Sequence, residues 1–233
     1  MRDTDSLFED WLHSLRDLTG SRELLESWQE RRFAFAHRVA NALVGPPGSP
    51  EITGPVLYGV YLSGSRLVYI GQTLDANRRL RDLLIGESHH LANTVPPELW
   101  ERVVVVRWPE LLDPADLVQI AVLDALPKKR SPEPRNDGLA VCGLALEHHL
   151  QLAHRPPLNS RRREAAGVWK MRNLTASKSA GAASAPRFAR LCREVHDEWE
   201  TLGTAPGLVD SLICEDLGPP GRMSSCRKLS RPS

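Results

Sequence analysis

The stretch "GPVLYGVYLSGSRLVYIGQT", residues 54–73, holds all three tyrosines of the chain, Tyr58, Tyr61 and Tyr69. Its two halves are rich in β-branched and aromatic residues and flank a short "SGS" segment, a pattern that predicts a β-hairpin. Because side chains alternate between the two faces of a strand, the geometry of the turn decides which tyrosines can act together.

Two turns are compatible with this hairpin, and they place Tyr61 and Tyr69 differently. A two-residue turn would leave the two side chains on opposite faces of the sheet. A three-residue loop at 63–65 would pair Gly59 with Tyr69 and bring both tyrosines to one face. We predict the three-residue loop, without a compensating bulge, since such loops commonly include a glycine at the position that needs a positive φ.

Residues after the hairpin alternate between helical and strand patterns. Apolar residues spaced by three or four predict helices at 73–86, 113–127 and 138–154, and the run "RVVVVRW" at 102–108 predicts a buried third strand. Asp113 followed by proline is typical of a helix start. These elements assign the middle of the chain to the α/β class.

The flanking segments differ in composition from this middle part. Residues 1–50 predict a helical N-terminal extension, closed by the helix-breaking sequence "GPPGSP" at 45–50. Residues 161–186 are basic and rich in small residues, which predicts a flexible linker. A helix is expected at 187–203, and the polar tail at 204–233 is expected to be disordered. Four tryptophans are expected in the core: Trp11, Trp28, Trp100 and Trp108.

Bulk composition argues against several classes of protein. The chain has 233 residues, is 41% apolar and has a net charge of +1. It lacks an apolar run of the roughly 20 residues that span a bilayer, and its acidic start is unlike a secretory signal, so we expect a cytoplasmic protein without a membrane partner. Four scattered cysteines predict no disulfide framework. His148, His149 and His154 near Cys142 match no standard zinc spacing, so zinc is not predicted.

Five positions together resemble the GIY-YIG nuclease family. "GVY" at 59–61 and "YIG" at 69–71 resemble its paired signature, and Arg79, Glu147 and Asn159 follow in the order of its arginine, metal-binding glutamate and terminal asparagine. The resemblance covers about residues 54–160. It implies an α/β sandwich with a small three-stranded antiparallel sheet flanked by helices. It also implies hydrolysis of DNA phosphodiester bonds with one divalent ion, Mg²⁺ or Mn²⁺, in restriction, repair or mobile elements.

The resemblance assigns a role to each matched residue. Glu147 would bind the metal, as carboxylates commonly do for Mg²⁺. Arg79 would supply a permanent charge and a planar fork for phosphate. Tyr61 would be the base or water-activating hydroxyl, with its pKa lowered by the arginine and the metal, and Tyr69 would position water or phosphate. Asn159 would hold one of these groups by a hydrogen bond. Tyr58, without a motif role, is expected to be a core residue.

Departures from the family pattern leave alternatives open. Leu83 stands where many members have His or Tyr and cannot move a proton, so His89 or His90 is a candidate shuttle. The spacing between Tyr61 and Tyr69 is shorter than in many members. A domain without catalysis that binds nucleic acid, and a protein–protein adaptor, are therefore kept as alternatives, and a homodimer is possible. Candidate contacts to nucleic acid are Arg78, Arg161, Arg162 and Arg163.

Overall fold

The structure is a computed structural model that describes residues 4–45, 50–85, 91–125, 137–163 and 168–204. A three-stranded antiparallel sheet lies at its centre, built from β1 (Val56–Leu62), β2 (Arg66–Thr73) and β3 (Trp100–Val106). The strand order is β2-β1-β3, so β2 and β3 are the edges. The predicted small antiparallel sheet and the mixed α/β class are confirmed.

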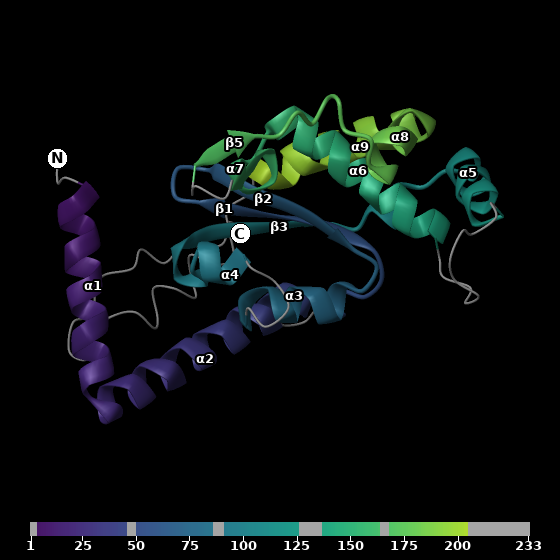
Figure 1. Cartoon of the computed structure of the whole chain (residues 1–233). Coiled ribbons are helices and arrows are strands. Elements are labelled where there is room, and N and C mark those ends of the chain that lie inside the picture. Colours follow the sequence, from purple (N-terminus) through teal and green to yellow (C-terminus); the bar gives the residue numbers. More distant parts are fainter. Residues whose placement is uncertain (1–3, 46–49, 86–90, 126–136, 164–167, 205–233) are drawn as a thin grey trace.

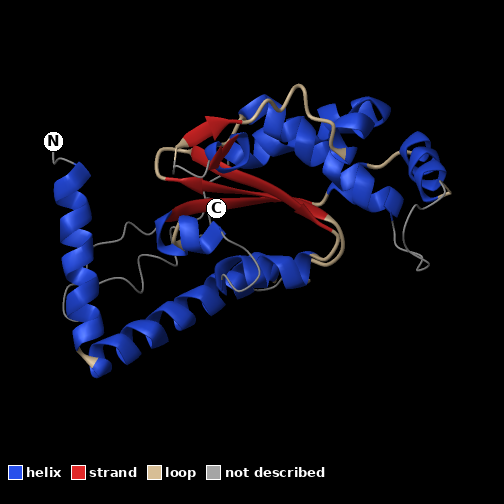
Figure 2. Cartoon of the chain, in the orientation of Figure 1, coloured by secondary structure: helices blue, strands red, loops and turns tan. Residues whose placement is uncertain are grey.

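Helices cover both faces of the sheet (Figures 1 and 2). One face packs on α2 (Arg22–Val44), α3 (Ala76–Ile85) and the short α4 (Leu91–Thr94). The other packs on α6 (Asp137–His154) and α9 (Ala189–Thr204), and the short α8 (Ala180–Ser184) packs on α6. The hydrophobic cluster on the first face is called the α3 layer, and the cluster on the second face is called the α6 layer.

The remaining elements connect or extend these layers. The 3₁₀ turns Pro97–Leu99 and Trp108–Leu111 flank β3, and Ala185–Phe188 precedes α9. Helix α5 (Pro114–Asp124) begins at Asp113, whose side chain accepts a hydrogen bond from the Asp116 N–H in a capping box. The short α7 (Pro157–Ser160) leads into a β-hairpin of β4 (Arg161–Arg163) and β5 (Trp169–Met171).

The turn of the central hairpin has the predicted length but not the predicted register. Residues 63–65 form the loop, with Gly64 and Ser65 at positive φ (76° and 55°). A bulge next to the loop leaves Val68 as an extra residue on β2, so that Tyr69 pairs with Val60 and not with Gly59. The bulge shifts the alternation by one residue. Tyr61 and Tyr69 therefore lie on opposite faces, and the prediction of a shared face is wrong.

The N-terminal helices are only partly an extension. Helix α1 (Thr4–Gly20) lies away from the sheet and contacts α2, whose N-cap is Ser21. The second half of α2 is buried in the α3 layer, so this segment belongs to the domain. Trp11 and Trp28 are 54% and 40% exposed, contrary to prediction, whereas Trp100 and Trp108 are fully buried as predicted.

The segment expected to be a flexible linker contains regular structure. Of residues 161–186, the described part includes the β4–β5 hairpin and α8, which packs closely on α6. Gly181 makes this approach possible, because a Cβ there would come within 2.3 Å of the Leu144 carbonyl oxygen. The predicted helix at 187–203 corresponds to α9. Residues 205–233 lie outside the described part. Among the described helices, none is both long and apolar enough to cross a bilayer.

Candidate active site at the edge of strand β2

The outer edge of β2 is closed by a side chain rather than by another strand. Asn159 Oδ1 accepts a hydrogen bond from the Ile70 N–H at 2.8 Å, and Asn159 Nδ2 donates to the Ile70 carbonyl at 2.9 Å. An edge strand has backbone groups that need partners, and the amide supplies one donor and one acceptor. Asn159, which is 7% exposed, therefore fixes the strand residue beside Tyr69 rather than a tyrosine hydroxyl.

Tyr58 and Tyr69 lie next to each other on the face of the sheet that packs against the α3 layer. Their ring centroids lie 6.0 Å apart, and their hydroxyls are hydrogen-bonded. Gly71, which pairs with Tyr58 across the strands, makes room for this contact, because a Cβ at this position would come within 2.6 Å of the Tyr58 ring and hydroxyl. Tyr58 is a core residue as predicted, only 1% exposed, and its ring also lies next to that of Tyr69.

Arg79 on α3 acts electrostatically on both hydroxyls. Burial raises the pKa of Tyr58 well above its ordinary value and that of Tyr69 to about 12, and the charge of Arg79 opposes the rise in both cases. The hydrogen bond between the hydroxyls raises the pKa of Tyr58 and lowers that of Tyr69, as expected when Tyr58 is the donor. These directions hold for the chain without a metal ion, whereas the lowered tyrosine pKa expected from the sequence depended on a bound ion and stays a prediction.

Glu147, on α6, lies near the same pair of tyrosines. It lines a cavity of about 790 Å³ together with Tyr69 and Asn159. Burial raises the pKa of the Glu147 carboxyl to about 7, against the opposing effect of a hydrogen bond of 2.9 Å from Gln151 Nε2. The negative charge of Glu147 in turn raises the pKa of both tyrosines. Glu147, Arg79 and the tyrosine pair thus form one electrostatic cluster around the edge of β2.

Further polar side chains line the cavity, and the sequence alone had not assigned them to this site. His148, Lys170 and Arg172 line it, the last two from the β4–β5 hairpin and the residue after it. Arg172 is held in place because its backbone N–H donates to the Ser160 carbonyl at 2.7 Å. The basic character of 161–186 was visible in the sequence, but its return to the cavity depends on the hairpin.

Tyr61 lies in the α6 layer, away from this cluster. Trp199 Nε1 donates to the Tyr61 hydroxyl at 2.9 Å, and the Arg102 guanidinium lies 4.8 Å from the ring centroid. Burial is the main cause that raises the pKa of Tyr61. The structure therefore does not bring Tyr61 to Glu147 and Asn159, and its assignment as the base is withdrawn. The sequence contained one signal for Tyr58: it stands eleven residues before Tyr69, whereas Tyr61 stands eight residues before it.

The other predicted residues have mixed outcomes. Leu83 is fully buried in the α3 layer, where it packs and cannot move a proton. Arg78 is exposed and forms an ion pair with Asp75 at 3.6 Å. Arg161 is exposed on β4. The backbones of Arg162 and Arg163 belong to β4, and their side chains lie outside the described part, as do His89 and His90.

The residues present fit a divalent ion of the Mg²⁺ type at one position. Glu147 supplies a carboxylate oxygen, which such ions prefer, beside a cavity large enough for their water ligands. The raised pKa shows that the ionised form of Glu147 lacks enough compensation for its burial. A bound cation would compensate this charge and favour the ionised carboxylate.

The chain matches no known family model, no curated protein and no solved structure.

Proposed function

We propose that the chain is a metal-dependent endonuclease that hydrolyses DNA phosphodiester bonds, with one Mg²⁺ or Mn²⁺ held by Glu147. The observation that carries this proposal is that Glu147 and Arg79 both act electrostatically on the tyrosine pair Tyr58–Tyr69, and that Glu147 and Tyr69 line one cavity. A carboxylate, a fixed cation and hydroxyl groups are the components that phosphodiester hydrolysis needs. The resemblance to GIY-YIG nucleases, with Tyr58 in place of Tyr61, agrees with the same residues.

The cavity also offers binding groups for a nucleic-acid backbone. Lys170 and Arg172 line it beside Glu147, and Arg161 is exposed on the neighbouring strand. Contacts between such residues and phosphates are independent of sequence and weaken as salt is raised. DNA would therefore lie across the β4–β5 hairpin, with one phosphate at the edge of β2.

Hydrolysis requires that a water oxygen forms a bond to phosphorus, that a P–O bond to deoxyribose breaks, and that protons move accordingly. Tyr69, which lines the cavity, would orient the water, and Tyr58 would orient Tyr69 by donating to its hydroxyl. Both phenols have raised pKa values and are poor bases. His148 is the better proton acceptor, because burial lowers its pKa and keeps it neutral. Arg79 would stabilise the phosphate charge, and the ion would polarise a phosphate oxygen.

Nicking of supercoiled plasmid tests this proposal. The full chain is assayed with Mg²⁺, with Mn²⁺ and with EDTA, alongside Glu147→Gln and Arg79→Ala. Matched controls are Glu198→Gln, an exposed carboxylate on α9, and Arg78→Ala, the exposed neighbour of Arg79. Metal-dependent nicking that is lost in the first two variants and retained in both controls supports the proposal. Nicking that survives Glu147→Gln contradicts it.

A nucleic-acid-binding module without catalysis is the second candidate, and the burial of Leu83 favours it. This position offers no group that moves a proton, so catalysis depends on His148 or on residues outside the described part. Salt-sensitive binding of DNA without nicking in either metal would identify the module. The exposed apolar side chains of α1 and α2 would favour an adaptor, if the chain neither binds nor cleaves DNA; they include Leu7, Phe8, Trp11, Leu24, Trp28 and Phe33.

A further inference from the structure

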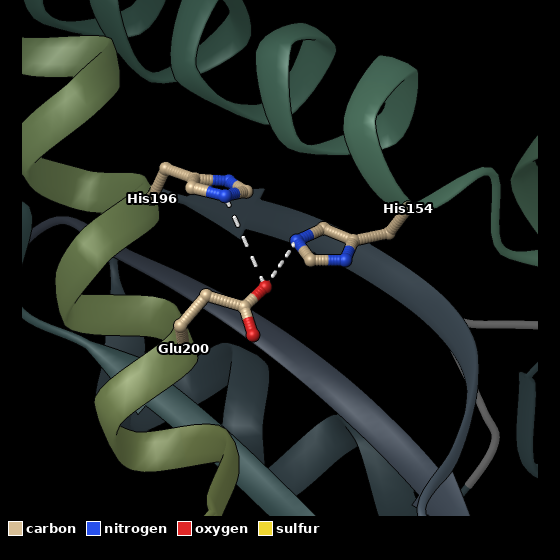
Figure 3. A group of neighbouring side chains, drawn as sticks. All are labelled: His154, His196 and Glu200. Atoms are coloured by element: carbon tan, nitrogen blue, oxygen red, sulfur yellow. Dashed lines mark ion pairs between the residues drawn. The ribbon is translucent and has the colours of Figure 1, made fainter.

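A second group of metal-ligating side chains lies between α6 and α9 and shares no residue with the cavity beside Glu147. His154 is the last residue of α6, and His196 and Glu200 stand four residues apart on α9. Figure 3 shows the three side chains pointing toward one another. One ligand atom from each lies within 4.8 Å of the others.

The contacts within this group are too long for hydrogen bonds. Glu200 Oε1 lies 3.6 Å from His154 Nε2 and 3.9 Å from His196 Nε2. His154 Nε2 is shielded from solvent and makes no hydrogen bond within the described part of the chain. A buried polar nitrogen without a partner is unfavourable, and a metal ion is one of the few partners that satisfies an imidazole nitrogen and a carboxylate together.

The geometry is close to that of a bound ion. Ligand atoms that hold Zn²⁺ tetrahedrally at about 2.0–2.1 Å are about 3.3 Å apart. The separations of 3.6 and 3.9 Å from Glu200 to the two histidines require shifts of a few tenths of an ångström, which exposed Glu200 can make by rotation of its side chain. The three ligand atoms lie within 4.8 Å of one another, so the two imidazole nitrogens must approach each other by up to about 1.5 Å through side-chain rotation. The His154 and His196 rings already lie near each other, with centroids 5.3 Å apart.

We propose that His154, His196 and Glu200 bind one Zn²⁺ ion, with water at the fourth position, and that the ion fastens α9 to α6. Two imidazoles and one carboxylate suit Zn²⁺ and other late divalent metals, whereas Mg²⁺ and Ca²⁺ prefer oxygen ligands only. Glu200 is 56% exposed, so the open side of the site faces solvent and leaves space for the water. Between the end of α6 at His154 and the start of α9 at Ala189 lie 34 residues, 155–188, so the ion would link distant segments.

The test uses Zn²⁺ alone as the probe and the full chain without a histidine tag. All variants are made in the Glu147→Gln background, so that the cavity carboxylate does not compete for the ion. After dialysis against EDTA, Zn²⁺ binding is measured by titration calorimetry and by the thermal midpoint. We expect one ion per chain, and a midpoint raised by about 5–10 °C at about 100-fold excess over Kd.

Single variants then locate the ion. We expect His154→Gln, His196→Gln and Glu200→Gln each to weaken binding by at least about 100-fold, the upper end of the loss seen for outer-shell partners. Glu198→Gln on the same helix and His13→Gln on α1 are matched controls and should bind normally. Glu200→Gln changes an exposed side chain, so it keeps the test valid if a histidine variant fails to fold. Absence of Zn²⁺ binding at 100 µM, taken as about 100 times a micromolar Kd, or equal binding by Glu200→Gln and Glu198→Gln, overturns the proposal.

Discussion

Tyr58 and Tyr61 lie on opposite faces of the sheet. Separate substitutions of each by phenylalanine should distinguish a tyrosine needed for catalysis from one needed only for packing. Each substitution removes one hydroxyl oxygen and keeps the ring. Tyr61→Phe leaves the buried Trp199 N–H without its acceptor at 2.9 Å, which costs about 1–3 kcal/mol of the free energy of unfolding. For a chain of this size each kcal/mol lowers the thermal midpoint by about 2–4 °C. Nicking by the folded protein should stay within about twofold of wild type, since no transition-state contact is removed.

Tyr58→Phe should have the opposite effect on activity. It removes the hydrogen bond to Tyr69, and a loss of about 1–3 kcal/mol in the transition state slows the reaction by about 5- to 150-fold. Tyr69→Phe, which changes the hydroxyl at the cavity, should cost more, about 10²–10⁴-fold. Single-turnover nicking is measured below the midpoint of every variant, with DNA binding measured in parallel. A tenfold loss of rate in Tyr61→Phe, with Tyr58→Phe fully active, would refute the assignment of the two faces.

Three further predictions concern stability in EDTA. Burial raises the pKa of Glu147 from 4.5 to about 7, so the folded protein binds this proton more tightly than the unfolded chain and loses stability as the pH rises from 4.5 to 7. At 1.36 kcal/mol per unit the loss is about 3 kcal/mol, and Glu147→Gln should remove it in urea titrations across this range. Asn159→Asp replaces a donor by a carboxylate opposite the Ile70 carbonyl and should cost about 1–3 kcal/mol at pH 7, less at pH 4 where the protonated acid can donate. Gly59→Ala would place a Cβ 2.4 Å from the Trp199 ring and should cost about 1–3 kcal/mol through overpacking, measured by thermal unfolding.

Each of these predictions has a control variant and a result that would contradict it. Glu198→Gln changes an exposed carboxylate, and an equal effect on the pH slope would show that Glu147 is not the source. Asn173→Asp changes an exposed amide after β5. If it destabilises the protein as much as Asn159→Asp does, the hydrogen bonds of Asn159 to Ile70 have no special importance for stability. Gly20→Ala adds a Cβ with no heavy atom within 4 Å. If Gly59→Ala is as stable as Gly20→Ala, the close approach of Trp199 to β1 is wrong.

The sequence was sufficient to predict elements whose signals are local. Alternation and the "SGS" segment predicted the hairpin and its loop at 63–65, and Asp113 predicted a helix start that the structure confirms. Arg79 and Glu147 were chosen by resemblance and position, and in the structure both act electrostatically on Tyr58 and Tyr69. The face of each tyrosine could not be predicted, because no local signal in the sequence marks the bulge at Val68, and one extra residue reverses every side chain beyond it.

Contacts between distant segments could not be predicted from the sequence either. Trp199 lies 138 residues from Tyr61, and His196 meets His154 only because α9 packs on α6. Histidines spaced irregularly along a sequence match no motif, even when the fold gathers them. The basic segment after residue 160 was recognised by composition, but composition contains no information on the hairpin that returns Lys170 and Arg172 to the cavity.

The two glycines of the paired signature have a common physical explanation in this chain. A Cβ at Gly59 would meet the Trp199 ring of the α6 layer, and a Cβ at Gly71 would meet Tyr58 on the α3-layer face. Each glycine thus lets an aromatic ring lie directly on a strand, on opposite faces of the sheet. Trp199 is fully buried, so α9 completes the cover of β1 and belongs to the same folding unit as the sheet. Tyr61, two residues after Gly59, lies on the same face of β1 as Trp199 and packs its ring in that layer, whereas Tyr58 lies on the opposite face, where it contacts Tyr69.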